Sequence, residues 1–139
     1  MSWKEYEYTA RFNGPGKAEY SYRPMVKISV AASTGSENFM ALIDSGSEIT
    51  MMSSEIADIL EISPAGCKTG VASGLGGNSP GFFSKVNIQI PEFPSQVITT
   101  NVLFIKDLSF DILLGQDDFF RTFLVRFEKH KNKFYLEIA

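Results

Sequence analysis

The sequence has little cysteine and histidine, and this scarcity excludes several kinds of protein. Its 139 residues include one cysteine, Cys67, and one histidine, His130. A single cysteine excludes an internal disulfide. His130 lies among lysines in a predicted turn, and no serine or cysteine near it suggests a nucleophilic triad. We therefore expect the functional chemistry to come from other side chains.

Basic residues and long apolar runs are also scarce. The formal net charge is −3 and the basic residues are scattered, so we expect no nucleic-acid partner. No stretch is long and apolar enough to span a membrane. The first residues, Met-Ser-Trp-Lys-Glu-Tyr, are polar and lack the apolar region of a signal peptide. We expect a cytoplasmic protein with no membrane segment in this chain.

The length and composition predict one globular domain, residues 1–139, with an apolar share that excludes disorder. Residues 1–21 are expected to be an N-terminal extension or an edge strand, since aromatic residues alternate there before a Gly-Pro turn. Residues 22–30 alternate as a strand, and residues 32–38 are expected to form a hairpin loop. The last residues, 123–138, are expected to form another hairpin.

The most informative stretch begins where an apolar run, residues 40–43, ends abruptly in Asp44. Ser45, Gly46 and Ser47 follow before apolar residues resume, which predicts a buried strand, a sharp polar turn and a second strand. A carboxylate directly after a buried strand is costly unless it is held in place. Gly46 lets the backbone approach closely, and we expect Ser47 to donate a hydrogen bond to the Asp44 carboxylate.

A glycine-rich stretch, residues 74–81, separates two further predicted strands, residues 66–73 and 82–90. A phosphate-binding loop would need a helix directly after the glycines, but Pro80 and a strand pattern follow, so that interpretation is rejected. Two interpretations remain: a mobile surface hairpin, or a hairpin that closes over a ligand. The residues at its tip are Gly74, Leu75, Gly76 and Gly77.

Short helices are predicted in two places. Residues 53–60 form either a helical turn capped by Ser53 or a plain loop. Further on, a short apolar run ends in glycine and is followed by acids and aromatic residues, which predicts a buried strand and then a short helix with Asp117 as its N-cap. That apolar run is Ile112, Leu113, Leu114 and Gly115.

Three of these motifs together resemble a known family. Residues 42–47 resemble the active-site loop of aspartic proteases, apolar-apolar-Asp-Thr/Ser-Gly-Ala/Ser. Residues 74–77 match the Gly-apolar-Gly-Gly tip of the family's flap, the hairpin that closes over a bound peptide. Residues 112–115, with Phe-Asp just upstream, resemble its second signature. In this order, over residues 22–138, they resemble retroviral-type (retropepsin-like) aspartic proteases, and retrotransposon-type or cellular single-domain members more closely.

The resemblance implies an all-β, closed-barrel-like retropepsin fold with one glycine-rich flap hairpin and one short helix near the C-terminus. It implies that Asp44 is catalytic and that Ser45, Gly46 and Ser47 complete the active-site loop. It also implies that residues 74–77 contact substrate and that residues 112–115 form a structural strand beside the loop. No metal or cofactor is expected.

The chemistry constrains the assembly. Peptide hydrolysis by carboxylates needs two of them sharing one proton, as in aspartic proteases generally. This chain has one Asp-Ser-Gly, whereas pepsin-like enzymes carry two copies of this motif in a much longer chain. We therefore expect a homodimer that supplies two copies of Asp44 and cleaves an extended peptide or polyprotein segment. The alternative is a catalytically inactive retropepsin-fold module that dimerises or binds peptides.

Overall fold

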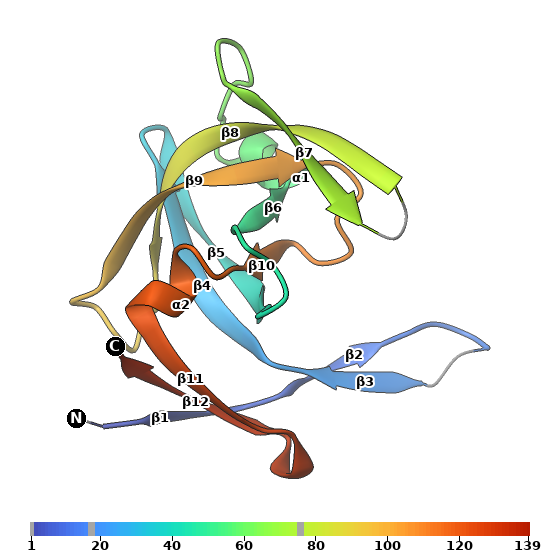
Figure 1. Ribbon diagram of the computed structural model, residues 1–139, viewed down its shortest axis with the longest axis vertical. Helices are drawn as coiled ribbons and strands as arrows, with labels where there is room; N and C mark the ends of the chain where they lie inside the picture. The colour runs from blue at the N-terminus through green and yellow to red at the C-terminus, as the bar shows by residue number, and fades with distance from the viewer. Residues whose placement is uncertain (1, 17–18, 75–76) are drawn as a thin grey trace.

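The computed structural model describes residues 2–16, 19–74 and 77–139, and most of these residues lie in strands (Figure 1). The elements are β1 Lys4–Glu7, β2 Thr9–Phe12, β3 Tyr20–Arg23, β4 Met25–Ala32, β5 Gly35–Ile43, β6 Met51–Ser53, α1 Ser54–Ile59, β7 Thr69–Gly74, β8 Gly77–Gln89, β9 Val97–Ile105, β10 Ile112–Leu114, α2 Phe119–Thr122, β11 Phe123–Glu128, the 3-10 turn η1 Lys129–Lys131 and β12 Lys133–Ile138.

The main sheet has the order β4-β5-β10-β6-β9-β8-β7. It curls into a barrel because β4 also pairs with β8, placing Val30 opposite Ile88. The short β10 lies parallel to β5 and antiparallel to β6. The prediction of an all-β, closed-barrel-like fold is therefore confirmed.

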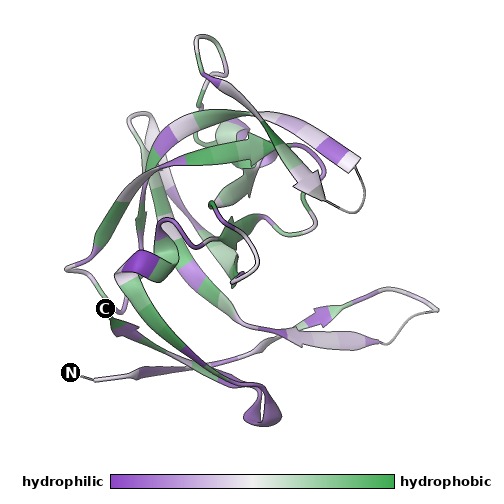
Figure 2. Cartoon of the chain, in the orientation of Figure 1, coloured by the Kyte–Doolittle hydropathy of each residue, from purple (hydrophilic) through white to green (hydrophobic). Residues whose placement is uncertain are grey.

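The core fills this barrel and follows the two-residue period of the strands. In β4 every second residue from Val26 to Val30 is buried. In β8, Val86 and Ile88 are buried and the residues on either side of them are not. Figure 2 shows the apolar residues concentrated along β4, β9 and β11, while η1 at the tip of the C-terminal hairpin is hydrophilic. Full burial of one such side chain contributes about 1.5–3 kcal/mol, so the barrel is the main source of stability.

Two strand boundaries differ from the sequence prediction. The strand predicted over residues 22–30 is split at Pro24, so β3 and β4 belong to different sheets. The hairpin predicted over residues 32–38 is confirmed, but its loop is shorter than predicted, residues 33–34, because Ala32 already pairs with Gly35. Ser36, Glu37 and Asn38 lie within β5, whose first half is exposed and so tolerates polar residues.

The two ends of the chain meet in a small second sheet of order β1-β12-β11, with β1 at its edge. β2 and β3 form a separate two-stranded hairpin that extends away from the barrel (Figure 1). Residues 53–60 do form a helix, and the Ser53 hydroxyl accepts a hydrogen bond from the Glu55 N–H at 3.3 Å. In the part of the chain that the structure describes, no helix has the length and apolar character to cross a membrane.

Candidate active site

Asp44 lies directly after β5 and is held by β10. Its backbone N–H donates to the Leu114 carbonyl at 3.0 Å, and Leu114 pairs with Ile43 across the parallel ladder. The Asp-Ser-Gly turn and the Ile-Leu-Leu-Gly motif are far apart in the sequence, and the fold brings them side by side. β10 thus fixes where the turn begins.

The turn itself is closed by the Ser47 N–H, which donates to the Asp44 carbonyl at 3.2 Å. The Gly46 N–H donates to Asp44 Oδ1 at 3.0 Å, so the backbone orients the half-buried carboxylate. Ser45 and Gly46 are exposed at the tip of the turn. The carboxyl group is therefore held in one orientation while one side of it remains open.

The expected hydrogen bond from Ser47 to the Asp44 carboxylate is wrong. The Ser47 hydroxyl donates to the Ile49 carbonyl at 2.6 Å. Ser47 is only 8% exposed, and a buried hydroxyl takes the acceptor that its own local backbone offers. Because the Ser47 hydroxyl donates its hydrogen bond to a backbone carbonyl of the loop, Ser47 stabilises the loop and does not donate to the Asp44 carboxylate.

Gly115 packs against the same turn so closely that no side chain fits. A Cβ atom at this position would lie 2.5 Å from the Ile49 carbonyl carbon and 2.9 Å from the Ser47 carbonyl oxygen. Both are backbone atoms, which cannot rotate away. The glycine that ends the second motif is thus required by the path of the Asp44 loop.

A buried polar network beneath the turn was not anticipated from the sequence. Thr50 is fully buried; its hydroxyl donates to Asp118 Oδ1 at 2.5 Å and accepts from the Gly115 N–H at 3.1 Å. Asp118 Oδ2 accepts from the Thr100 hydroxyl at 3.2 Å. The signal in the sequence was Thr50 itself, since a polar residue amid apolar strand residues needs a partner.

Asp118 is also the N-cap of α2, which corrects the assignment of that role to Asp117. Asp118 Oδ1 accepts from the Phe119 N–H at 2.7 Å, and α2 begins at Phe119. Asp117 is exposed and contributes its backbone N–H to the Glu48 carbonyl at 2.8 Å. With two adjacent aspartates, the pattern located the cap to within one residue.

Gln116 is a second residue that the sequence did not single out. Its side-chain amide donates to the Ser45 carbonyl at 2.7 Å, and its backbone N–H donates to the Ser47 carbonyl at 2.9 Å. It therefore binds both sides of the exposed turn from the segment that follows β10.

The Asp44 turn borders a cleft of about 380 Å³. One wall contains Asp44, Gly46 and Glu48, and the facing wall contains Val71, Ala72 and Ser73 of β7. Figure 1 shows the β7–β8 hairpin above the loop that follows β5. The glycine-rich stretch thus lies in a hairpin across the cleft from the carboxylate.

At the end of this hairpin Gly74 pairs with Gly77, and the predicted tip residues Leu75 and Gly76 lie outside the described residues. Whether the hairpin closes over a ligand stays a prediction. Over residues 2–16, 19–74 and 77–139, no group of three or more His, Cys, Asp and Glu side chains is arranged to hold a metal ion.

Comparison with known proteins agrees with this geometry. A family model described as aspartyl protease matches residues 28–117, more than half of the chain. The structure of EIAV protease complexed with the inhibitor HBY-793 matches with a TM-score of 0.56 and 21% identity, over 68% of this chain and 83% of that chain. No curated protein sequence gives a match. The chain has the retropepsin-like fold and belongs to the aspartyl protease family.

Proposed function

We propose that this protein is an aspartic endopeptidase that acts as a homodimer, with one Asp44 from each subunit in a shared site. The observation that carries the proposal is the position of Asp44, whose half-buried carboxyl group borders a cleft opposite β7. The backbone of the turn and β10 hold this group, as catalysis by a positioned carboxylate requires.

The requirement for two subunits follows from the chemistry. A water molecule attacking a peptide carbonyl must lose a proton to a base while an acid polarises the carbonyl oxygen. Two adjacent carboxyl groups sharing one proton fill both roles, because like charges so close together do not both ionise. The sequence offers one Asp-Ser-Gly turn, so the second carboxyl group comes from another copy.

In the proposed reaction the ionised Asp44 takes a proton from water as the water oxygen bonds to the scissile carbonyl carbon. The protonated Asp44 of the other subunit gives its proton to the carbonyl oxygen, forming a neutral tetrahedral diol. The C–N bond then breaks as one carboxyl group protonates the leaving nitrogen and the other accepts a hydroxyl proton. The exposed Ser45 hydroxyl is proposed to contact the partner's turn and align the two carboxyl groups.

The substrate is proposed to be a peptide or polyprotein segment in extended form. β7 is the last strand in the order of the main sheet, so among the described residues one of its edges has no strand partner. An extended peptide can pair with such an edge, and the adjacent side chains then select its residues. Because Val71, Ala72 and Ser73 of β7 line the cleft, such pairing would lay the peptide beside Asp44.

A peptide-library cleavage assay with the Asp44→Asn variant tests the enzyme assignment. The amide keeps the shape of the side chain but cannot take a proton, so we expect turnover to fall by about 10³-fold or more. Asp117→Asn is the matched control, since Asp117 is exposed and its side chain does not line the cleft. Undiminished cleavage by Asp44→Asn would refute the proposal. Peptide binding by the wild-type dimer without any cleavage would instead support the inactive module.

Mixing the two proteins tests the shared site. Mixed dimers of wild type and Asp44→Asn carry one native carboxyl group and should be inactive. Adding excess Asp44→Asn to wild type should therefore lower the wild-type activity itself. Activity that stays proportional to the amount of wild type would contradict a site made by two chains.

A further inference from the structure

The β2–β3 hairpin, hereafter the arm, extends from the barrel and lies outside the residues that the family model matches. In the described part of the chain, β2 and β3 pair with each other and with no other strand. A two-stranded hairpin on its own is marginally stable in water. The persistence of the arm therefore depends on contacts beyond the pairing of β2 with β3.

The arm turns its apolar face outward. Phe12 pairs with Tyr20 and Ala10 pairs with Tyr22, so all four side chains share one face. Phe12, Tyr20 and Tyr22 are 59%, 55% and 47% exposed, and the Phe12 and Tyr20 rings pack edge to face at 5.7 Å. Exposed aromatic residues grouped on one face mark an interaction surface.

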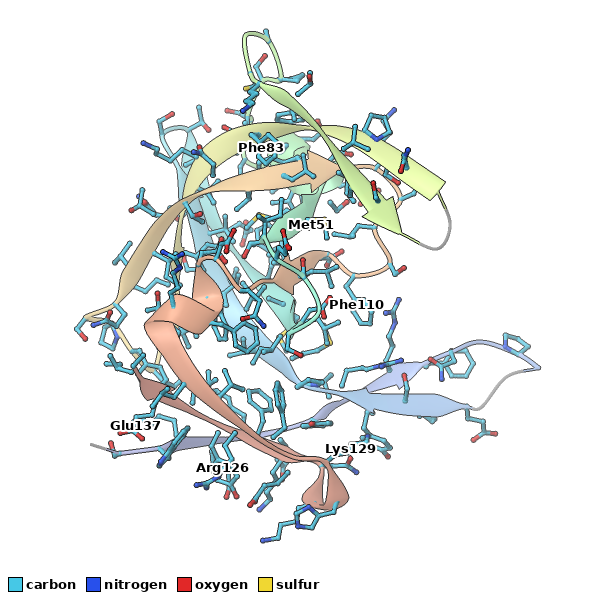
Figure 3. All side chains as sticks on the ribbon, in the orientation of Figure 1. Met51, Phe83, Phe110, Arg126, Lys129 and Glu137 are labelled. Atoms are coloured by element: carbon cyan, nitrogen blue, oxygen red, sulfur yellow. The ribbon has the colours of Figure 1, made fainter. Side chains whose placement is uncertain are left out.

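The opposite face of the arm is polar and packs on the barrel. Arg11 donates to the Ser109 carbonyl at 2.7 Å, and its guanidinium lies 3.9 Å from the centroid of the Phe110 ring. Figure 3 shows Phe110 at the base of the arm. A hairpin that packed only on its own barrel would place its aromatic face there, so this orientation indicates that something else covers the aromatic face.

The root of the arm is joined to the candidate active site. The Ser109–Phe110 segment leads directly into β10, whose Leu114 carbonyl holds the Asp44 N–H. In Figure 1 the arm and the β7–β8 hairpin extend toward the same side of the molecule as the loop after β5, and the two termini lie on the other side. A partner whose Asp44 meets this one must occupy that side.

We propose that the arm clasps the second copy of this chain, with Phe12, Tyr20 and Tyr22 buried against it in the dimer. The inference rests on the proposed function, because the shared site requires the second copy. Position favours this occupant, because the arm extends toward the side on which the partner's Asp44 turn must lie. The other candidate occupant, the peptide substrate, is an outcome of the test.

Sedimentation velocity of a Phe12→Ser/Tyr20→Ser variant tests the clasp, with turnover measured on the same samples. We expect the dimer dissociation constant to rise by about 100-fold, at about tenfold per aromatic anchor. At concentrations that restore the dimer, activity should return to within about twofold of wild type, because neither residue lines the cleft. The control is Ile59→Ser/Val97→Ser, which removes two apolar residues that are 57% and 55% exposed elsewhere. It should dimerise as wild type does.

The outcomes separate this inference from the proposed function. If the wild type is a dimer and the arm variant has the same dimer dissociation constant, the proposed role of the arm is overturned and the shared site is not. A raised KM with an unchanged dissociation constant would also overturn it, assigning the arm to substrate. A wild type that is monomeric and active would overturn the shared site, and the clasp with it.

Discussion

The Asp44 turn and the β7–β8 hairpin face each other across one cleft, but they are held very differently. The turn donates a backbone hydrogen bond to Leu114 of β10, accepts two from Gln116 and is packed against Gly115. In the described residues β7 pairs with β8 and no other strand, and Val71 is 58% exposed. The wall of the cleft that carries Asp44 is thus fixed by the core. The wall formed by β7 is attached to the sheet only through its pairing with β8.

This difference matches the two tasks of a protease. A carboxyl group must be positioned before the reaction, since a displacement of 1 Å can cost about 100-fold in rate. A polypeptide substrate must enter and leave, which requires a segment of low local stability. Substitutions under the turn should therefore reduce stability and activity together, whereas substitutions in the hairpin should reduce activity alone.

The largest effect is expected from Gly115→Ala. The added Cβ would lie 2.5 Å from backbone atoms of Ile49, so the turn must move, and we expect a loss of more than about 3 kcal/mol in the free energy of unfolding. Urea denaturation measures this loss. Gly16→Ala is the control, because Gly16 has φ +79° but open space around it, and backbone strain alone costs about 1–2 kcal/mol. If Gly115→Ala and Gly16→Ala lost equal free energy of unfolding, the close packing of Gly115 against Ile49 would not be what requires glycine there.

Asp118→Ala should have the next largest effect. It leaves the Thr50 and Thr100 hydroxyls and the Phe119 N–H without their acceptor, and we expect a loss of about 2–3 kcal/mol together with lower turnover. Asp117→Ala, one residue away and exposed, should change the free energy of unfolding by less than about 0.5 kcal/mol. A larger loss for Asp117 than for Asp118 would contradict the assigned network.

Patterns local in the sequence predicted the elements of the site but not the bonds between them. The apolar run before Asp44, the glycine-rich hairpin and the run 112–115 were visible because each is a short segment of distinctive local composition. The Thr50–Asp118 bond joins residues 68 positions apart, and only the folded barrel brings them together. The acceptor of the Ser47 hydroxyl is the nearby Ile49 carbonyl, but the sequence did not predict it. The direction of a side chain in a turn depends on which face of the turn the rest of the fold buries.

In the hairpin, Val71→Ser should separate activity from stability. Val71 lines the cleft on β7, so we expect kcat/KM to fall by about tenfold, as for one apolar contact to substrate. The free energy of unfolding should change by less than about 0.5 kcal/mol because the side chain is exposed. Val97→Ser, at a site that is 55% exposed on β9 and away from the cleft, should alter neither quantity. An equal loss of activity in Val97→Ser would contradict the assignment of a substrate contact to Val71 of the hairpin.

The smallest effect concerns Ser47→Ala. Losing the hydrogen bond to the Ile49 carbonyl should cost about 1 kcal/mol in the free energy of unfolding. The acidic side of the pH–activity profile should keep its position, because the hydroxyl proton is not shared with the Asp44 carboxylate. A profile displaced along the pH axis would show that Ser47 does contact that carboxylate during turnover.

The central claim is that two chains make one site, and a dilution series tests it most directly. Sedimentation velocity gives the dimer fraction of the wild type at each concentration, and turnover is measured on the same samples. Specific activity should fall in step with the dimer fraction, because a monomer has one Asp44 and no partner to share its proton. Full specific activity from a species that sediments as a monomer would contradict the account.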